Sequence, residues 1–427
     1  MSEWKELKIE EFCEVVGGGT PSTKEDSYYG GDISWITPRD LTNHKNRFIS
    51  RGERNITELG LKNSSARILP KNSILLTSRA PIGYLAIAEN EVCTNQGFKS
   101  LIVDAAKADY NFVYYLIKSN VEIIKGLGTG TTFAEISGSV VKGLKFTIPD
   151  LHTQTAIAEI LSSLDDKIEL NNKINQELEN LAQTLFKQWF IDFEFPNENG
   201  KPYKSSGGEM VESELGEIPK GWEVERLGDH LYIKGRIGWK GLKKTEYLKE
   251  SEGYSIVNGS DFLNEQIDYN TCGWIPKNRY EDSPEIQLKQ NDILITKDGT
   301  IGKLAFVNKL EHPTSVASGI FVVRANSKNV STYFCWSFFK SSYFQNLVKS
   351  RIDGSVIPHL YQKDFVEMFI PLPSSTLLEE FESQAKSIFE LVFKNKEESK
   401  ALSKLRDTIL PKLISGELEV SQTQITA

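Results

Sequence analysis

The stretch NSILLTSRAPIGYLA at residues 72–86 has a counterpart 219 residues later, NDILITKDGTIGKLA at 291–305. In each stretch a β-rich apolar run leads into a turn, and Gly83 or Gly302 supplies a residue that tolerates positive φ. The two stretches therefore predict a duplicated β-turn-β element.

Further segments of the chain repeat in the same order, which extends the duplication to whole domains. The paired segments are NQGFKSLIV (95–103) with ASGIFVVRA (317–325), TGTTFAEI (129–136) with DGSVIPHL (353–360), KFTIP (145–149) with EMFIPLP (367–373), and WKELKIEEF (4–12) with WEVERLGDH (222–230). We predict two similar mixed α/β domains at 1–150 and 222–373, because a length of 427 residues exceeds one ordinary core.

The Gly302-Lys303 pair looks like the end of a phosphate-binding loop, but the rest of that motif is missing. The motif needs a glycine where Lys297 stands and a serine or threonine where Leu304 stands. The first copy has Gly83-Tyr84 at the equivalent place. We therefore interpret the pair as part of a structural turn and not as a nucleotide site.

Each copy is followed by a segment with the apolar spacing of a long amphipathic or coiled-coil helix, predicted at 151–191 and 374–418. A polar residue interrupts both stripes, Asn171 in the first and Asn395 in the second. The two asparagines either lie in the seam and set its register or lie on exposed faces. The predicted interface positions on these helices are Leu164, Ile168, Asn171, Leu178, Leu185, Trp189, Ile388, Asn395, Leu402, Leu405 and Ile409.

These patterns together predict an α+β protein. Two pseudo-symmetric mixed α/β domains would be separated by a pair of long antiparallel helices, which most simply pair with each other across a pseudo-two-fold axis. The Pro-, Gly-, Ser- and Glu-rich residues 192–221 are expected to form an exposed linker, and 419–427 a flexible tail.

The composition is typical of a globular protein, with 39% hydrophobic and 25% charged residues. The charged start lacks a secretory signal and no apolar run is long enough to cross a bilayer, so we expect a cytoplasmic protein. Four cysteines and five histidines are scattered without metal-ligand spacing, so no metal site is predicted.

The net charge of −8 is unevenly distributed. Residues 159–217 hold thirteen acids and five bases, which accounts for the whole net charge. Basic residues gather instead at 64–79 and 234–249. Two basic patches beside an acidic middle suit a nucleic-acid partner, although charge runs also form ordinary solvated faces.

Many phrases of the chain, in order over about residues 3–420, are similar to those of the specificity subunits of Type I restriction–modification systems. They are GGTPS (18–22), WITPRDL (35–41), TSRAPIG (77–83), NQGF (95–98), LSSLDDKIELNNKIN (161–175), ELGEIPKGW (214–222), GRIGWKG (235–241), TKDGTIGK (296–303), IPHL (357–360) and LRDTILPKLISGEL (405–418).

The resemblance implies a DNA-binding, non-catalytic member of a host-defence and DNA-methylation system. Its two target-recognition domains would read the halves of a bipartite asymmetric site in double-stranded DNA. Its long helices would space them and dock two methyltransferase (modification) subunits. S-adenosylmethionine, ATP and magnesium would be used by those subunits and by restriction subunits, with no cofactor on this chain. The chain also lacks the Asn/Asp-Pro-Pro-Tyr/Phe motif of an amino-methyltransferase.

Direct readout of DNA needs Arg or Lys for guanine, Asn or Gln for adenine, and basic residues for phosphates. On that basis, the predicted DNA contacts in the first domain are Thr20, Lys24, Arg39, Arg79, Asn95, Gln96 and Lys99. Those in the second are Arg236, Lys240, Lys243, Lys244, Lys297, Arg351 and His359. We expect Arg236→Ala and Lys243→Ala to weaken binding to all sequences alike.

A different class of protein remains open at this point. A coiled-coil scaffold with two globular ends and no DNA partner would also carry long amphipathic helices, and it would agree with the acidic net charge. The local basic patches and the duplicated domains favour the DNA-reading hypothesis.

Overall fold

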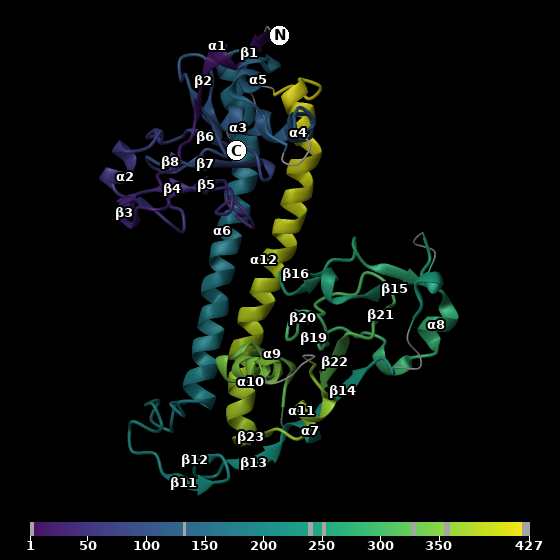
Figure 1. Ribbon diagram of the computed structural model, residues 1–427. Coiled ribbons are helices and arrows are strands. Elements are labelled where there is room, and N and C mark those ends of the chain that lie inside the picture. Colours follow the sequence, from purple (N-terminus) through teal and green to yellow (C-terminus); the bar gives the residue numbers. More distant parts are fainter. Residues whose placement is uncertain are drawn as a thin grey trace. The chain divides into compact units, whose positions relative to one another are not determined.

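The computed structural model describes residues 4–130, 134–237, 242–249, 253–326, 330–353 and 359–420, except for the side chains of 244 and 351–353 (Figure 1). The chain forms two compact units. Unit 1 combines Met1–Asn172 with Lys396–Ala427, and unit 2 is Lys173–Asn395. The boundary between them falls inside each of two long helices, α6 (Leu151–Phe190) and α12 (Ser375–Ser415).

Unit 1 is built on a five-stranded sheet with the order β2-β9-β6-β7-β5. The strands are β2 (Cys13–Gly17), β5 (Phe48–Ile49), β6 (Ile74–Ser78), β7 (Ile82–Ala88) and β9 (Lys99–Val103), with β1 (Lys5–Lys8) paired to β10 (Lys145–Ile148), β4 (Trp35–Ile36) paired in parallel to β8 (Cys93–Thr94), and β3 (Tyr29–Ile33). The short helices are α1 (Ile9–Phe12), η1 (Asp26–Tyr28), α2 (Glu58–Lys62), α3 (Tyr110–Ser119), α4 (Val121–Gly126) and α5 (Gly138–Gly143).

The sheet of unit 1 is buried on both faces, which explains why β6 begins with three consecutive apolar residues, Ile74, Leu75 and Leu76. Ile74 and Leu76 join a core with Phe112 and Tyr115 of α3, whereas Leu75 packs in a second cluster on the opposite face. Asp109 begins α3 because its carboxylate accepts a hydrogen bond from Phe112 N. The aromatic stripe of α3 is therefore core.

Unit 2 repeats this topology with a four-stranded sheet in the order β14-β22-β19-β20. The strands are β14 (Leu231–Gly235), β19 (Ile293–Thr296), β20 (Leu304–Phe306) and β22 (Ile320–Ala325), with β13 (Glu223–Arg226) paired to β23 (Phe369–Leu372), β15 (Tyr254–Val257) to β18 (Gly273–Ile275) and in parallel to β21 (Thr314–Val316), β16 (Phe262–Leu263) to β17 (Gln266–Ile267), and β11 (Met210–Ser213) to β12 (Gly216–Pro219). The short helices are α7 (Leu227–His230), η3 (Lys244–Glu246), η4 (Gly259–Asp261), α8 (Lys277–Glu281), η5 (Pro284–Ile286), α9 (Thr332–Lys340), α10 (Ser342–Asp353) and α11 (Gln362–Val366).

Four strands of the two sheets correspond in the same order, β2, β9, β6 and β7 in unit 1 to β14, β22, β19 and β20 in unit 2, and β5 is an additional strand of the unit 1 sheet. Even the turn before the central strand is the same. Asn72 and Asn291 both have positive φ, 68° and 71°. Their backbone N–H groups donate hydrogen bonds to Ala88 O and Val307 O, respectively, both at 2.8 Å. The duplication predicted from the sequence is present in the three-dimensional structure.

Within each unit, the parts of α6 and α12 that it contains run antiparallel. In unit 1, Asp165 of α6 pairs with Arg406 of α12, and further along α6 Lys167 pairs with the earlier Glu398. In unit 2, Phe186 of α6 packs against Phe381 of α12 with ring centroids 5.9 Å apart. The predicted fold class, mixed α/β domains with a pair of long antiparallel helices, is confirmed.

Both asparagines of the helix seam are buried, which settles the alternative that the sequence left open. Asn171 is fully buried in unit 1, and its Nδ2 donates to Glu398 Oε2 at 2.9 Å and to Ser399 Oγ at 3.3 Å. In unit 2 the Nδ2 of Asn395 donates to Asn175 Oδ1 at 2.9 Å. These polar contacts suit one register of the helices, as expected for a polar residue within a seam.

The connector after α6 is ordered and partly buried, in contrast to the exposed linker expected from its composition. Strands β11 and β12 form a hairpin, and Ile218 belongs to the core of unit 2. Phe195 stacks on Tyr203 and on Trp222, with centroids 4.5 and 5.4 Å apart. The Pro- and Gly-rich composition thus reflects turns between these apolar anchors.

Within the described part of the chain, no helix combines the length and the apolar character needed to cross a membrane. In the same residues, no three or more His, Cys, Asp or Glu side chains are grouped so that they could hold a metal ion.

Candidate nucleic-acid interface

The duplicated turn is held by the same side-chain bonds in both units. Thr77 Oγ1 donates to Pro81 O at 2.7 Å and accepts from Tyr84 N at 2.8 Å. In unit 2, Thr296 Oγ1 donates to Thr300 O at 2.5 Å and accepts from Lys303 N at 2.9 Å. The backbone amide of Lys303 is therefore part of a hairpin turn, as expected if the Gly-Lys pair is structural.

The turn glycine is required by conformation and by space in both units. Gly83 and Gly302 have φ of 95° and 79°. A Cβ atom at Gly83 would lie 2.9 Å from Val121 Cγ1, and one at Gly302 would lie 2.8 Å from Val348 Cγ1. Each turn can approach its neighbouring helix only because the residue has no side chain.

Two further loops meet the turn at matched positions. In unit 1, Ser78 N donates to Gly97 O at 2.7 Å and Ser78 O accepts from Ile136 N at 3.0 Å. In unit 2, Lys297 N donates to Gly319 O at 2.8 Å and Lys297 O accepts from Leu360 N at 3.2 Å. Each unit therefore gathers three loops, distant in sequence, into one group that we call the loop junction.

The junction of unit 1 contains several of the predicted DNA contacts. Thr20 Oγ1 donates to Gln96 Oε1, and Asn95 Oδ1 accepts from Gly97 N at 2.8 Å. The backbones approach so closely that a Cβ atom at Gly18 would lie 1.9 Å from Asn95 O. The GGTPS and NQGF phrases are thus adjacent, and an exposed amide side chain, Gln96, is held in place between them.

Arg79 and Lys99 share one carboxylate in unit 1. Arg79 Nη1 lies 3.5 Å from Glu135 Oε2, and Lys99 Nζ lies 3.5 Å from Glu135 Oε1. The Arg79 and Glu135 side chains are about one-third exposed, at 35% and 40%. The cluster carries a net positive charge that an anion can reach.

The two other predicted contacts of unit 1 lie in separate loops. The side chain of Lys24 is exposed in the loop between β2 and β3. Arg39 follows β4, and its Nε lies 3.7 Å from Glu53 Oε2 at the surface. In the described part of unit 1, no hydrogen bond or ion pair joins these two side chains to the other five predicted residues.

The junction of unit 2 holds Lys297 and His359. The Nζ atom of Lys297 lies 5.0 Å above the Phe321 ring, a cation–π arrangement. The Nδ1 atom of His359 contacts Asp298 Oδ1, and its ring lies 4.6 Å from that of Tyr361. Both side chains are partly exposed.

Arg236 is not placed where a phosphate contact would be expected. It is only 3% exposed, and its guanidinium donates to Val316 O, Ser283 Oγ and Ser315 Oγ at 3.2–3.3 Å. Burial, reinforced by the nearby charge of Arg279, lowers its pKa. The side chain joins the segments around β14, β21 and η5 inside unit 2, so the structure gives Arg236 a structural role.

The remaining basic candidates of unit 2 are only partly described. Lys243 is exposed, and its backbone amide donates to Glu246 Oε2 at 2.7 Å. Lys244 opens η3 and Arg351 lies in α10, but their side chains are outside the described atoms. Lys240 lies outside the described residues.

Glu135 and Asp298 also belong to the junctions, but they are not among the DNA contacts predicted from the sequence. A signal for them was present in the repeat, which aligns Arg79 with Asp298 and Glu135 with His359. In each unit, one of the two aligned positions is acidic and the other is basic. The turn position is basic in unit 1 (Arg79) and acidic in unit 2 (Asp298). Only the structure shows that these pairs touch.

The predicted helix-interface residues lie at several levels of burial. Asn171, Trp189 and Asn395 are buried, and Leu405 is 49% exposed. The partly exposed positions are Leu164, Ile168, Leu178, Leu185, Ile388, Leu402 and Ile409. Within each unit the helices thus keep apolar surface that the chain itself does not cover.

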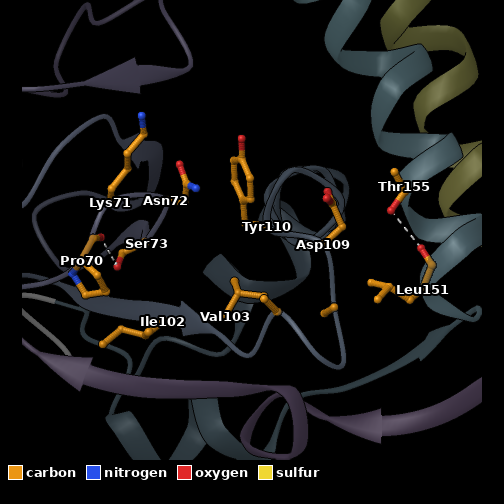
Figure 2. A pocket seen from close by; sticks show the side chains of 12 residues that line it. Pro70, Lys71, Asn72, Ser73, Ile102, Val103, Asp109, Tyr110, Leu151 and Thr155 are labelled. Atoms are coloured by element: carbon orange, nitrogen blue, oxygen red, sulfur yellow. Dashed lines mark hydrogen bonds between the residues drawn. The ribbon is translucent and has the colours of Figure 1, made fainter.

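A cavity of about 380 Å³ in unit 1 lies apart from the junction (Figure 2). It is lined by the turn before β6, by Ile102 and Val103 of β9, and by Asp109 and Tyr110 at the start of α3. None of the predicted DNA contacts lines it. The Oδ1 atom of its Asp109 accepts the hydrogen bond that caps α3.

Arg236→Ala is expected to destabilise unit 2 by about 2–3 kcal/mol, because it leaves buried Ser283 and Ser315 without their charged partner. Lys243→Ala, at an exposed position, should leave stability within about 0.5 kcal/mol. Urea unfolding followed by hydrogen exchange on unit 2 peptides would measure both. Equal stability of the two variants would contradict the structural role of Arg236.

Comparisons with known proteins also indicate a role in DNA recognition. A family model described as "Type I restriction modification DNA specificity domain" matches residues 1–180 and 219–412. The chain is 36% identical over 431 residues to the Type I restriction enzyme MjaIX specificity subunit of Methanocaldococcus jannaschii, covering 98% of this chain and 94% of the relative. It is 24% identical over 481 residues to the HindI specificity subunit of Haemophilus influenzae, covering 98% and 100%.

The fold is also that of a solved structure. The crystal structure of a Type I restriction–modification system S subunit from M. genitalium superposes with a TM-score of 0.62 at 19% identity, covering 96% of each chain. At this identity the likeness shows a shared fold.

Proposed function

Because the chain belongs to the family of Type I restriction–modification DNA specificity subunits, we propose that its two junctions read the two halves of a bipartite DNA site. Membership in this family confirms the non-catalytic recognition role predicted from the sequence. The observation that carries the proposal is the duplicated loop junction, whose backbone hydrogen bonds repeat while its side chains differ.

The difference in side chains supports an asymmetric site. At equivalent positions unit 1 has Ser78 and Arg79, whereas unit 2 has Lys297 and Asp298. These residues offer DNA different donors, acceptors and charges on the same backbone frame. Two readers of unlike chemistry on one chain therefore suit two half-sites of unlike sequence.

The DNA contacts proposed for unit 1 are those gathered at its junction, together with the exposed side chains of the outer loops. Gln96 suits adenine, since its amide can donate and accept at once. Lys99 and Arg79 lie beside it with a net positive charge, and Lys24 and Arg39 suit phosphates. Lys297 and Lys243 are the corresponding proposals in unit 2.

The long helices are proposed to dock two methyltransferase (modification) subunits, with restriction subunits joining the full complex in the cytoplasm. Exposed apolar side chains on both helices support this, among them Leu181 (54%), Leu391 (42%) and Leu405 (49%). The recognition domains would be 1–150 and 222–373. The partner subunits would use S-adenosylmethionine, ATP and magnesium.

The adenine methylome of the source strain, with and without this gene, tests the proposal. Deletion is expected to abolish one bipartite, asymmetric methylated motif, and reintroducing the gene should restore it. An expressed complex that methylates no such motif would contradict DNA reading, and a scaffold with no DNA partner would then explain the helices better.

A further inference from the structure

The two loop junctions contain a pair of one acidic and one basic side chain at the same two positions, with the acid and the base exchanged. In unit 1, Arg79 on the turn pairs with Glu135. In unit 2, Asp298 on the turn pairs with His359. The repeat aligns Arg79 with Asp298 and Glu135 with His359, so acid and base have changed places while the contact has been kept.

The pair joins two loops that are distant in sequence. Arg79 and Glu135 are also bridged through their backbones, and Ile136 N donates to Ser78 O beside them. In unit 2 the matching bond runs from Leu360 N to Lys297 O at 3.2 Å. The side-chain pair therefore adds a second attachment between the turn and the segment that leads into α5 or α11.

The change from Arg79 to Asp298 argues against a phosphate contact as the shared role of the turn position. A guanidinium at Arg79 could bind phosphate, but the carboxylate of Asp298 would repel it. Mutual attraction between the two loops is the property that both arrangements have in common. The pair as a whole, and not the sign of either member, is what the two units preserve.

We propose that Arg79–Glu135 and Asp298–His359 are positioning pairs that hold each turn in the geometry needed to discriminate bases, which rests on the proposed function. The side chains positioned in this way differ between the units. In unit 1 the pair fixes the position of the Lys99 side chain, because Lys99 Nζ also lies 3.5 Å from Glu135 Oε1. In unit 2 the pair holds the backbone next to Lys297 in place. The Nζ atom of Lys297 lies over the ring of Phe321.

Transplanting the pair of unit 1 into unit 2 tests this inference. Asp298→Arg, His359→Glu and the double variant are prepared as full-length chains assembled with their modification subunits. Methylation rates are measured on duplexes with the wild-type motif and with single-base changes in each half-site. Each single variant should lower discrimination in the half-site read by unit 2 by about fivefold, the limit for a partly exposed pair. The double variant should restore discrimination in that half-site to within about twofold of the wild-type value.

The half-site read by unit 1 is the internal control. Glu281→Arg makes the same change of charge as Asp298→Arg, but at an exposed position of α8. It should leave discrimination unchanged. Asp298→Asn and His359→Gln provide milder variants should a reversal unfold unit 2, and a smaller loss in the same half-site is expected for both.

Three outcomes would overturn the inference. A double variant as poor as His359→Glu would show that the histidine contacts DNA directly. Single and neutral variants that all discriminate like the wild type would show that the pair positions nothing. A wild-type complex that prefers no motif would overturn the proposed function itself, and the positioning role with it.

Discussion

Asp165→Ala is expected to destabilise unit 1 by about 3–5 kcal/mol, the range seen when one member of a buried ion pair is removed. Asp165 is 4% exposed, and its carboxylate accepts from the Tyr115 hydroxyl at 2.7 Å and from the Arg406 guanidinium. Lys118 Nζ lies 3.9 Å away. Without the carboxylate, two partly buried cations would lack their shared counter-charge.

The pKa shifts agree with this network. Burial works to lower the pKa of Arg406, but the charges and hydrogen bonds of Asp165 and Asp407 together outweigh it, so the pKa is raised. Burial dominates at Lys118, whose pKa is lowered despite the attraction of Asp165. Asp165 thus stabilises Arg406 in its charged form, and its loss would remove that stabilisation.

Hydrogen exchange on peptides of α3 and of residues 151–172, combined with urea unfolding, would measure the effect in unit 1. Asp407→Ala is the matched control, because its carboxylate also pairs with Arg406 but is 60% exposed, and it should cost less than about 1 kcal/mol. Equal losses for the two variants would show that burial does not set the contribution of Asp165.

Phe381→Ala should destabilise unit 2 by about 3–5 kcal/mol, because it leaves a cavity at the centre of an aromatic cluster. Phe381 of α12 is fully buried, with ring centroids 4.9 Å from Phe190, 5.9 Å from Phe186 and 6.0 Å from Trp189. Through these three rings it joins α12 to α6 within unit 2. Hydrogen exchange of the backbone amides should therefore be faster in residues 173–190 and 375–395 of this variant.

Leu391→Ala separates packing from docking on the same helix. Leu391 is 42% exposed, so its replacement should change stability by less than about 1 kcal/mol. If the helix face docks modification subunits as proposed, this variant should instead weaken assembly, measured by analytical ultracentrifugation of the complex. A Phe381→Ala variant no less stable than Leu391→Ala would contradict the central role of the aromatic cluster.

Local patterns were enough to predict the duplicated architecture. The run Ile74-Leu75-Leu76 needed no long-range information, because a strand buried on both faces must be apolar throughout. Gly83 and Gly302 were equally readable, since a turn with positive φ selects glycine. The three-and-four spacing of apolar residues likewise predicted both long helices.

Charge runs were a weaker guide, as Arg236 shows. In the sequence it belongs to a basic stretch, and the expectation was an exposed phosphate contact. In the fold it meets Ser283 and Ser315, which are 47 and 79 residues away. No local pattern reports such partners, because they are brought together only when β14, β21 and η5 pack.

The sequence by itself determined the strands and turns of the duplicated element and the long helices, since each depends on residues a few positions apart. It also determined the repeat, because the two copies can be aligned directly. Tertiary structure alone decided which polar groups are buried and which charges meet. It placed Asn171 and Asn395 in the seam of their helices, and it joined Arg79 to Glu135 and Asp298 to His359. Those contacts close loops of many residues, and their stability depends on burial and on packing partners that a linear pattern does not contain.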